Sequence, residues 1–365
     1  MPDTVEILTV ALGERSYPIQ FGRDLSAHLS DALAAESARK RSIAVITDEH
    51  VERAWPELFE HVCRGFPRYV VPAGESSKSL KCFGNACEFL ARERIDRGGL
   101  LVAVGGGVIG DLAGFVAASF LRGIDYWQVP TTLLAMVDSA VGGKTAINLA
   151  AGKNLVGAFH QPRTVLCDMA LLDTLPAREF AAGMAEVLKY GLLADAELFS
   201  RLEASPVHGP GDETLSGIVR KCCAIKAAIV GDDERETAAS GGRVLLNLGH
   251  TFAHAIEAVA GYGEYLHGEA VGVGMVAAAR LSERLGLVKH TVVERAGSVI
   301  AAHHLPVRLR AGLPVGLLLD AMQRDKKVMH GRLKLVVLEA IGRAATRADV
   351  PSDMIGEIWS ELGAS

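Results

Sequence analysis

Three segments in the second half of the chain carry residues that could bind a metal ion. MAEVLKYGLL places Glu186 and Lys189 three residues apart, on one face of a predicted helix. NLGHTFAHAIE places His250 and His254 four residues apart, again on one face, and LHGEAVGVGM adds His267. Two or three histidines with a carboxylate, leaving positions open to water or substrate, are typical of a catalytic zinc site. A single histidine on an apolar face is usually a satisfied core residue, but this combination favours a metal.

A glycine-rich turn in the first half could bind a pyrophosphate. The strand-like run LLVAV leads into GGGVIGD, where Gly105, Gly107 and Gly110 satisfy the G-x-G-x-x-G pattern ahead of a predicted helix. Such glycines let the backbone approach phosphate at a helix N-terminus. Asp48, which closes the strand-like IAVITD, is a better candidate for the ribose hydroxyls than Asp125, which precedes a strand. The alternative is that Asp48 only caps a helix.

Two further loops combine charged residues with glycine. In VPAGESSKSL, Glu75 and Lys78 follow another predicted strand, although a solvated turn would have the same composition. The run VDSAVGGKTAIN resembles the end of a phosphate-binding P-loop, but the first glycine of that motif would fall on an aspartate, which excludes it. What remains is a polar set suited to the phosphate of a small ligand, unless its lysines are simply solvated: Asp138, Lys144, Lys153 and Asn154.

A wider set of cations could concentrate a field on a multiply anionic ligand: Arg122, Lys144, Lys153, Lys189, Lys226, Arg243, Lys326 and Lys327. Each alone is more typical of a surface, except Lys189, whose apolar helix makes solvation unfavourable. The remaining histidines lie in polar or loop contexts and are expected at the surface: His28, His50, His61, His160, His208, His290, His303, His304 and His330.

The elements that must position these residues fall into two groups. Up to residue 175, strand-like runs alternate with helical periodicity, which predicts a Rossmann-like α/β domain with a parallel sheet. The predicted strands are 43–47, 69–71, 100–104, 126–129 and 164–167, and the predicted helices are 51–63, 83–94 and 112–121. From 176 to 365 we expect a mostly helical domain, with helices over 177–203, 212–231, 247–260, 269–285, 291–303 and 315–328 and one strand over 333–338.

Composition narrows the class of protein. The 365 residues include 38 Lys and Arg and 43 Asp and Glu, a net charge of −5, which argues against a general nucleic-acid binder. Hydrophobic residues make up 49%, which excludes a largely disordered chain. The six cysteines show no paired spacing and are expected as buried reduced thiols. The N-terminus lacks a signal-peptide pattern and the apolar runs are too short to span a membrane, so we expect a cytoplasmic protein without a membrane partner.

Together these segments resemble the 3-dehydroquinate synthase family of sugar-phosphate cyclases. The resemblance covers nearly the whole chain and is carried by GGGVIGDLAGF, QVPTTLLAMVDSAVGGKTAIN, GKNLVGAFHQP, AEVLKYGL, NLGHTFAHAIE and HGEAVGVGM. It implies NAD, a divalent metal (usually zinc, with cobalt possible), a homodimer and an active site in the cleft between the two domains. It also implies that 3-deoxy-D-arabino-heptulosonate 7-phosphate is converted to 3-dehydroquinate and phosphate, in the shikimate pathway, by transient oxidation, phosphate elimination, reduction, ring opening and aldol closure.

The resemblance also implies roles for individual residues. The metal ligands are Glu186, His250 and His267. The NAD site comprises Asp48, Glu75, Lys78, Gly106, Gly107, Val108, Ile109, Gly110, Asp111, Thr131, Thr132, Lys144, Lys153, Leu171 and Thr174. The substrate contacts are Arg122 (supplied across the dimer), Asp138, Lys144, Lys153, Asn154, Lys189, Lys226, Arg243, Asn247, His254 and Lys327.

The sequence departs from the family pattern at two places, and three alternative functions remain open. The stretch 236–243 is longer than is usual in the family, and Ala253 replaces a customary glycine. One alternative is a related cyclase acting on a sedoheptulose or glucose phosphate, which would not need Lys226 and Arg243 to bind a carboxylate. The others are a metal-dependent polyol dehydrogenase, which would accumulate NADH, and a non-catalytic dinucleotide-binding or interaction protein.

Overall fold

The chain folds into two compact units. A computed structural model describes residues 5–238, 241–261, 263–327, 334–348 and 350–365, with only the backbone described at 325–327. Unit 1 comprises Met1–Pro176 and Glu213–Gly231, and unit 2 comprises Ala177–Asp212 and Asp232–Ser365. The predicted boundary at 175 falls beside this division, but the segment 213–231, which we expected in the helical domain, groups with unit 1.

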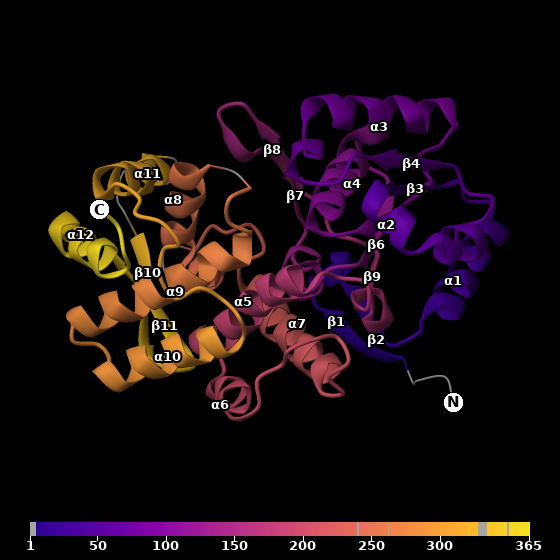
Figure 1. The fold of residues 1–365 in the computed structure, drawn as a ribbon. Helices are drawn as coiled ribbons and strands as arrows, with labels where there is room; N and C mark the ends of the chain where they lie inside the picture. The colour runs from indigo at the N-terminus through magenta and orange to yellow at the C-terminus, as the bar shows by residue number, and fades with distance from the viewer. Residues whose placement is uncertain (1–4, 239–240, 262, 328–333, 349) are drawn as a thin grey trace. The chain divides into compact units, whose positions relative to one another are not determined.

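Unit 1 is built on a mostly parallel sheet, drawn in indigo to magenta in Figure 1. Among the described residues its seven strands are ordered β1 (Glu6–Val10), β2 (Tyr17–Gly22), β9 (Thr164–Asp168), β6 (Asp125–Pro130), β5 (Leu100–Gly105), β3 (Ile43–Asp48) and β4 (Arg68–Val71). Only β1 pairs antiparallel, with β2. The carboxyl ends of the parallel strands therefore share one edge, where open α/β sheets bind ligands.

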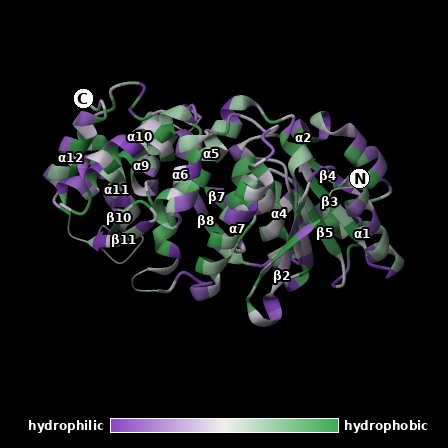
Figure 2. Cartoon of the chain, turned by 90° about the horizontal axis from the view of Figure 1, so that it is seen from below, coloured by the Kyte–Doolittle hydropathy of each residue, from purple (hydrophilic) through white to green (hydrophobic). Residues whose placement is uncertain are grey.

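Both faces of this sheet are buried, because successive side chains of a strand point to opposite sides. Ala44 and Ile46 of β3 pack in one apolar cluster with Leu90 and Leu112. Ile43 and Val45 belong to the cluster on the other face. Burial on both faces explains why β3 and β5 are hydrophobic along their length rather than alternating (Figure 2).

Helices and a small hairpin complete unit 1. The helices are α1 (Ser26–Ala38), α2 (Glu49–Ala54), α3 (Leu80–Arg92), α4 (Gly107–Ser119) and α7 (Leu215–Asp232), the last of which ends one residue beyond the unit. The hairpin consists of antiparallel strands β7 (Lys144–Leu149) and β8 (Gly152–Phe159). Short 3-10 or π turns cover Gly13–Arg15, Leu58–Val62, Glu75–Ser77, Phe120–Arg122, Ala135–Ser139 and Met169–Leu172.

Unit 2 is mainly helical and is organised around one buried helix. Helix α9 (His267–Arg284) contacts most of the other elements of the unit (Figure 1). The contacted elements are α5 (Ala177–Leu193), α8 (His250–Ala260), α10 (His290–Ala302), α12 (Ser352–Glu361) and β10 (Lys334–Ala340). The remaining elements are α6 (Ala196–Ala204), α11 (Val315–Lys327), β11 (Arg343–Ala348), which pairs with β10, and a 3-10 turn, Gly242–Asn247.

Two glycines let the helices of unit 2 approach closely. A β-carbon at Gly268 of α9 would lie 1.9 Å from the carbonyl oxygen of Ala182 in α5. One at Gly274 would lie 2.1 Å from the carbonyl oxygen of Gly249, the residue immediately before α8. Since both obstructing atoms belong to backbone, any side chain at these positions would push helices apart.

The predicted fold class is confirmed: a Rossmann-like parallel sheet is accompanied by a mostly helical remainder. Several boundaries differ. The helix predicted from residue 112 begins at Gly107, and the one predicted from 247 begins at His250. The helix predicted over 177–203 is interrupted at Asp195, whose side chain caps α6. Strands β1, β2, β7, β8 and β11 were not predicted. Leu333, where a strand was expected to start, lies outside the described residues.

The cysteines and histidines differ partly from expectation. All six cysteines lie in the described part of the chain and none forms a disulfide, but Cys82 and Cys87 are only half-buried. His303, expected at the surface, is 1% exposed: its Nδ1 lies 2.8 Å from the Val299 carbonyl oxygen, and its Nε2 accepts the Val207 N–H. Both ring nitrogens are thereby satisfied, which permits burial of the neutral ring. None of the helices in the described part of the chain has the length and apolar character needed to cross a membrane.

Replacing Gly274 with alanine should destabilise unit 2 by about 1–3 kcal/mol, the usual cost of overpacking. Gly297 of α10 is a matched control, because a β-carbon there meets nothing within 4 Å. Gly297→Ala should be neutral or stabilising by up to about 1 kcal/mol through its higher helix propensity. Thermal unfolding of both variants measures the difference, and equal unfolding midpoints would contradict the close-packing argument.

Candidate active site

The three predicted metal ligands come together in unit 2. Glu186 lies in α5, and His250 and His267 are the first residues of α8 and α9. Their ligand atoms lie within 4.8 Å of one another. The Glu186 Oε1 atom is 3.5 Å from Nε2 of His250 and 3.8 Å from Nε2 of His267. Side chains from three helices thus converge on one point.

The chemistry of this cluster suits a divalent cation. Glu186 is fully buried, yet neither of its carboxylate oxygens has a hydrogen-bond partner among the described residues. Lys189, one turn away, forms an ion pair with it. A buried carboxylate without hydrogen bonds is destabilising, and a metal ion would supply the missing interactions.

The protonation of His250 also suits metal binding. Burial lowers the pKa of His250 well below its usual value, and the charge of Lys189 lowers it further, so the imidazole is neutral. Its Nδ1 lies 3.2 Å from the carbonyl oxygen of Leu248, which can only accept a hydrogen bond. The proton of the neutral ring therefore belongs on Nδ1, which leaves the Nε2 lone pair directed toward Glu186.

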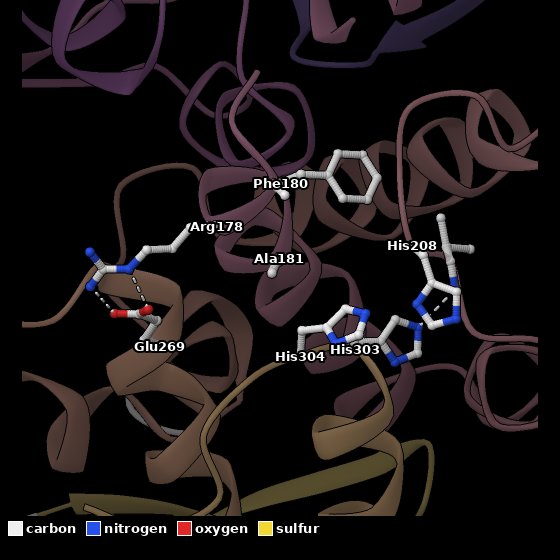
Figure 3. Close-up of a pocket in the computed structure, with 9 residues that line it drawn as sticks. Arg178, Phe180, Ala181, His208, Glu269, His303 and His304 are labelled. Carbon is white, nitrogen blue, oxygen red and sulfur yellow. Dashed lines mark hydrogen bonds and ion pairs between the residues drawn. The ribbon is translucent and has the colours of Figure 1, made fainter. Parts of the chain in front are cut away.

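An ion pair fixes the start of the helix that carries His267. Arg178, in the first turn of α5, donates two hydrogen bonds to the carboxylate of Glu269, at 2.7 and 2.8 Å (Figure 3). Glu269 also accepts the backbone N–H of Leu266 and pairs with Arg310. Because Arg178 and Glu269 belong to the helices of Glu186 and His267, this pair joins the helices that carry two of the predicted metal ligands. Arg178 and Glu269 also line the cavity drawn in Figure 3, together with His208, His303 and His304. Its volume is 310 Å³, and none of the three predicted metal ligands lines it.

The other predicted site residues of unit 2 lie on nearby segments. His254 is one turn after His250, and the two ring centres are 5.8 Å apart. It is exposed and is not part of the metal group, as expected. Asn247 ends the 3-10 turn that precedes α8 and is half-buried. Lys327 ends α11, but its side chain lies outside the described part of the chain.

One carboxylate, that of Asp233, binds the described residues before Arg243. Asp233 accepts the backbone N–H groups of Thr237, Ala238 and Arg243. Burial alone would raise the pKa of Asp233, but these hydrogen bonds hold it below its usual value. The Arg243 side chain is 2% exposed and donates to the Glu234 carbonyl oxygen at 2.9 Å. The described residues Thr237, Ala238 and Arg243 are therefore held by one ionised aspartate.

In unit 1, the glycine turn joins β5 directly to α4. Gly105 ends β5, and Gly106 precedes the first residue of α4 without a side-chain cap. A β-carbon at Gly106 would lie 3.0 Å from Thr132, and one at Gly110 would lie 2.6 Å from the Gln128 side chain. The small residues thus let Thr132 and Gln128 pack against this turn, and the start of α4 has no side-chain cap, which is the arrangement that binds a pyrophosphate. Val108, Ile109 and Asp111 continue this first part of α4.

The remaining predicted NAD residues follow strand ends at the same sheet edge. Asp48 ends β3 and caps α2, accepting the N–H groups of His50 and Val51 through Oδ1. Asp48 therefore does cap a helix, but Oδ2 has no hydrogen bond in the described part of the chain and could still accept one from ribose. Thr131 and Thr132 follow β6, and Leu171 and Thr174 follow β9. The Leu171 side chain belongs to the apolar core, whereas the Thr174 hydroxyl accepts from Trp55.

A hydrogen-bonded network links this edge to the β7–β8 hairpin. Lys78 is 5% exposed, so its side chain does not lie in a solvated turn, which was the alternative interpretation. Its Nζ atom donates to Asp111 at 2.6 Å and to Asn154 at 2.5 Å. Burial raises the pKa of Asp111 despite the charge of Lys78. Asn148, which the sequence analysis missed, donates to Glu75 and accepts the backbone N–H of Asn154, both at 2.8 Å. Its position in the KTAIN run was the available signal.

The polar set around Lys144 is divided between two places in unit 1. Lys144 and Asn154 line a cavity of 460 Å³ together with Asp111. Asp138 instead contacts Lys226 of α7, whose Nζ lies 2.7 Å from both its Oδ1 and its carbonyl oxygen. Lys153 is half-buried in β8. Arg122 is exposed in a turn where Leu121, Arg122 and Gly123 all have positive φ.

Comparisons with known proteins agree with this combination of folds and sites. Profiles of the N-terminal and C-terminal domains of 3-dehydroquinate synthase match residues 68–182 and 183–328. A curated 3-dehydroquinate synthase of Opitutus terrae is 58% identical over the full length of both chains.

Two solved structures resemble this chain. A 2-epi-5-epi-valiolone synthase from Streptomyces hygroscopicus, with NAD⁺ and Zn²⁺ bound, superimposes with a TM-score of 0.86 and 29% identity, covering 96% of this chain and 98% of that one. A 2-deoxy-scyllo-inosose synthase, complexed with carbaglucose-6-phosphate, NAD⁺ and Co²⁺, superimposes with a TM-score of 0.82 and 27% identity, covering 98% and 100%.

Fold and site together define a sugar-phosphate cyclase, with a glycine-rich strand–helix turn in one unit and a histidine–carboxylate cluster that could hold a metal in the other. Within that class the family is settled by the domain profiles and by the full-length relative. The chain belongs to the 3-dehydroquinate synthase family. The resemblance inferred from the sequence is thereby confirmed.

Asn148→Ala should weaken NAD binding about tenfold, because it removes one hydrogen bond to Glu75 and one from Asn154, each worth about 0.5–1.5 kcal/mol. Fluorescence titration with NADH measures this effect. Zinc affinity should stay unchanged, since all three predicted metal ligands lie in unit 2. Unaltered NADH affinity would show that the Asn148 network does not shape the dinucleotide site.

Proposed function

We propose that the protein is a 3-dehydroquinate synthase, converting 3-deoxy-D-arabino-heptulosonate 7-phosphate to 3-dehydroquinate and phosphate. The observation that carries the proposal is the cluster of Glu186, His250 and His267 in a chain whose full length matches a curated member of the family. The relatives with 29% and 27% identity are named as synthases of other products. Their identity is lower than the 58% of the curated 3-dehydroquinate synthase, which favours the dehydroquinate assignment.

The proposed reaction is redox-neutral overall. The C5 alcohol is oxidised to a ketone, which acidifies the C6 hydrogen; the C6 proton and phosphate are then lost, the ketone is reduced, and the ring opens and recloses by an aldol step. Bound NAD would accept a hydride from C5 of the substrate and later return it to the same carbon. A divalent metal held by Glu186, His250 and His267 would act as a Lewis acid on the substrate hydroxyls. Zinc is the metal we expect, with cobalt as a substitute.

The chain's own residues would bind and orient a substrate that carries both phosphate and carboxylate. Lys144, Asn154, Lys189 and Arg122 are proposed to hold the phosphate, and the position of Lys144 and Asn154 around one cavity supports this. Lys226 and Arg243 are proposed for the carboxylate, with Lys327 nearby. Lys153 is proposed as a further substrate contact. Asp138, Asn247 and His254 would order hydroxyls and water for proton transfer.

The residues proposed for these roles come from both units. Lys144, Asn154 and Lys226 belong to unit 1, whereas Lys189, Arg243 and the metal ligands belong to unit 2. We further propose that the protein acts as a cytoplasmic homodimer and that Arg122 is supplied across the dimer. The exposed position of Arg122 is compatible with that role.

The decisive assay supplies the heptulosonate phosphate with substoichiometric NAD and zinc. We expect one phosphate and one carbocycle per substrate consumed, without accumulation of NADH. Chelation should abolish turnover, and added zinc or cobalt should restore it. Stoichiometric NADH would instead indicate a polyol dehydrogenase, and turnover of sedoheptulose or glucose phosphate in place of the heptulosonate would indicate another cyclase.

Lys144→Ala should lower kcat/KM about 10- to 100-fold, because a charge-assisted contact is worth about 1.5–3 kcal/mol. Steady-state phosphate release measures the change. Lys81→Ala serves as a control, since Lys81 is an exposed lysine of α3 outside the proposed site and should leave kcat/KM unchanged. Equal rates for both variants would remove Lys144 from the substrate site.

A further inference from the structure

Glu257 lies beside the metal cluster and has no role in the function proposed above. It belongs to α8, seven residues after His250, so both side chains lie on the same face of the helix. It is 7% exposed. Its Oε1 atom lies 3.6 Å from Nδ1 of His267, the first residue of α9.

The two ring nitrogens of His267 therefore face two different carboxylates. Nε2 lies 3.8 Å from Glu186, the proposed metal ligand, while Nδ1 lies 3.6 Å from Glu257. A neutral imidazole carries one proton and can bind a metal only through the other nitrogen. A carboxylate beside Nδ1 favours the proton at that position, which leaves the Nε2 lone pair on the side of Glu186.

His250 is oriented differently. Its Nδ1 faces the backbone carbonyl of Leu248, which no substitution removes, and its pKa is lowered by burial. The His267 side chain is 35% exposed, against 12% for His250, so packing restrains it less. His267 is thus the ligand whose orientation depends most on a side-chain partner.

We propose that Glu257 is a positioning residue of the metal centre: it accepts the Nδ1–H of His267, fixes the tautomer and ring orientation, and strengthens Nε2 as a metal ligand. Outer carboxylates that act on histidine ligands in this way typically change metal affinity 10- to 100-fold. This inference rests on the proposed metal centre but not on the identity of the substrate. One face of α8 would then supply both a ligand and the group that orients another.

The test compares Glu257→Gln and Glu257→Leu with the unaltered protein. Zinc affinity is measured by competition with a chromophoric chelator, and the d–d absorption of the Co²⁺-substituted protein reports ligand geometry. We expect Glu257→Leu to weaken zinc binding 10- to 100-fold and to alter the Co²⁺ spectrum. Glu257→Gln should show a smaller loss, because its amide oxygen still accepts the N–H without the charge.

Glu36→Gln is the matched control. Glu36 is also a buried glutamate, 8% exposed, but it belongs to unit 1 and pairs with Arg39 and Arg41. It should leave zinc affinity unchanged. The unfolding midpoints of the Glu257 variants and the unaltered protein are also measured in chelator, without metal. A purely structural effect would lower the midpoint of the metal-free variant without changing its zinc affinity.

Zinc affinity of Glu257→Gln equal to that of the unaltered protein would overturn the proposal, even if Glu257→Leu failed to fold. Absence of tight zinc binding to the unaltered protein would overturn it together with the metal centre. If zinc binding depends on Glu257 as expected but no carbocycle forms from the heptulosonate phosphate, the proposed substrate is wrong and the positioning role stands.

Discussion

The structure depends on a buried carboxylate. Glu186 is fully enclosed in α5, its oxygens have no hydrogen bond in the described part of the chain, and its ion-pair partner Lys189 is equally buried. Taking two charges out of water is costly, and one ion pair seldom compensates for it. A divalent cation between Glu186, His250 and His267 would offset that cost, which explains why a charge is retained where the helix is otherwise apolar.

Packing in unit 2 positions Glu186, His250 and His267. The two histidines each begin a helix, so small displacements of α8 or α9 move a ligand directly. Gly268 and Gly274 allow the close approach of backbone, and Arg178 with Glu269 ties the start of α5 to the start of α9. Unit 1 uses a different principle, because its ligand-binding residues follow the carboxyl ends of parallel strands and need only short turns to meet.

The sequence predicted most of what depends on local pattern. Buried strands such as β3 and β5 are continuous apolar runs, and the i, i+4 spacing of His250 and His254 identifies one helix face. The sequence did not predict β7, a short strand that includes lysine and asparagine, or β8, which contains two glycines and has no buried residue. Nor could it show that α7 packs with unit 1, that Lys226 contacts Asp138, or that Asn148 links Glu75 to Asn154. Those contacts join residues far apart in the sequence.

X-ray absorption at the zinc edge of the metal-loaded protein would test the metal centre most directly. The structure predicts a first shell of two imidazole nitrogens and carboxylate or water oxygens at about 2.0–2.2 Å. A sulfur scatterer at about 2.3 Å, or a shell without imidazole, would contradict it. In that case Glu186 would be buried for a reason other than metal binding, and the proposed reaction would lack the metal ion on which it depends.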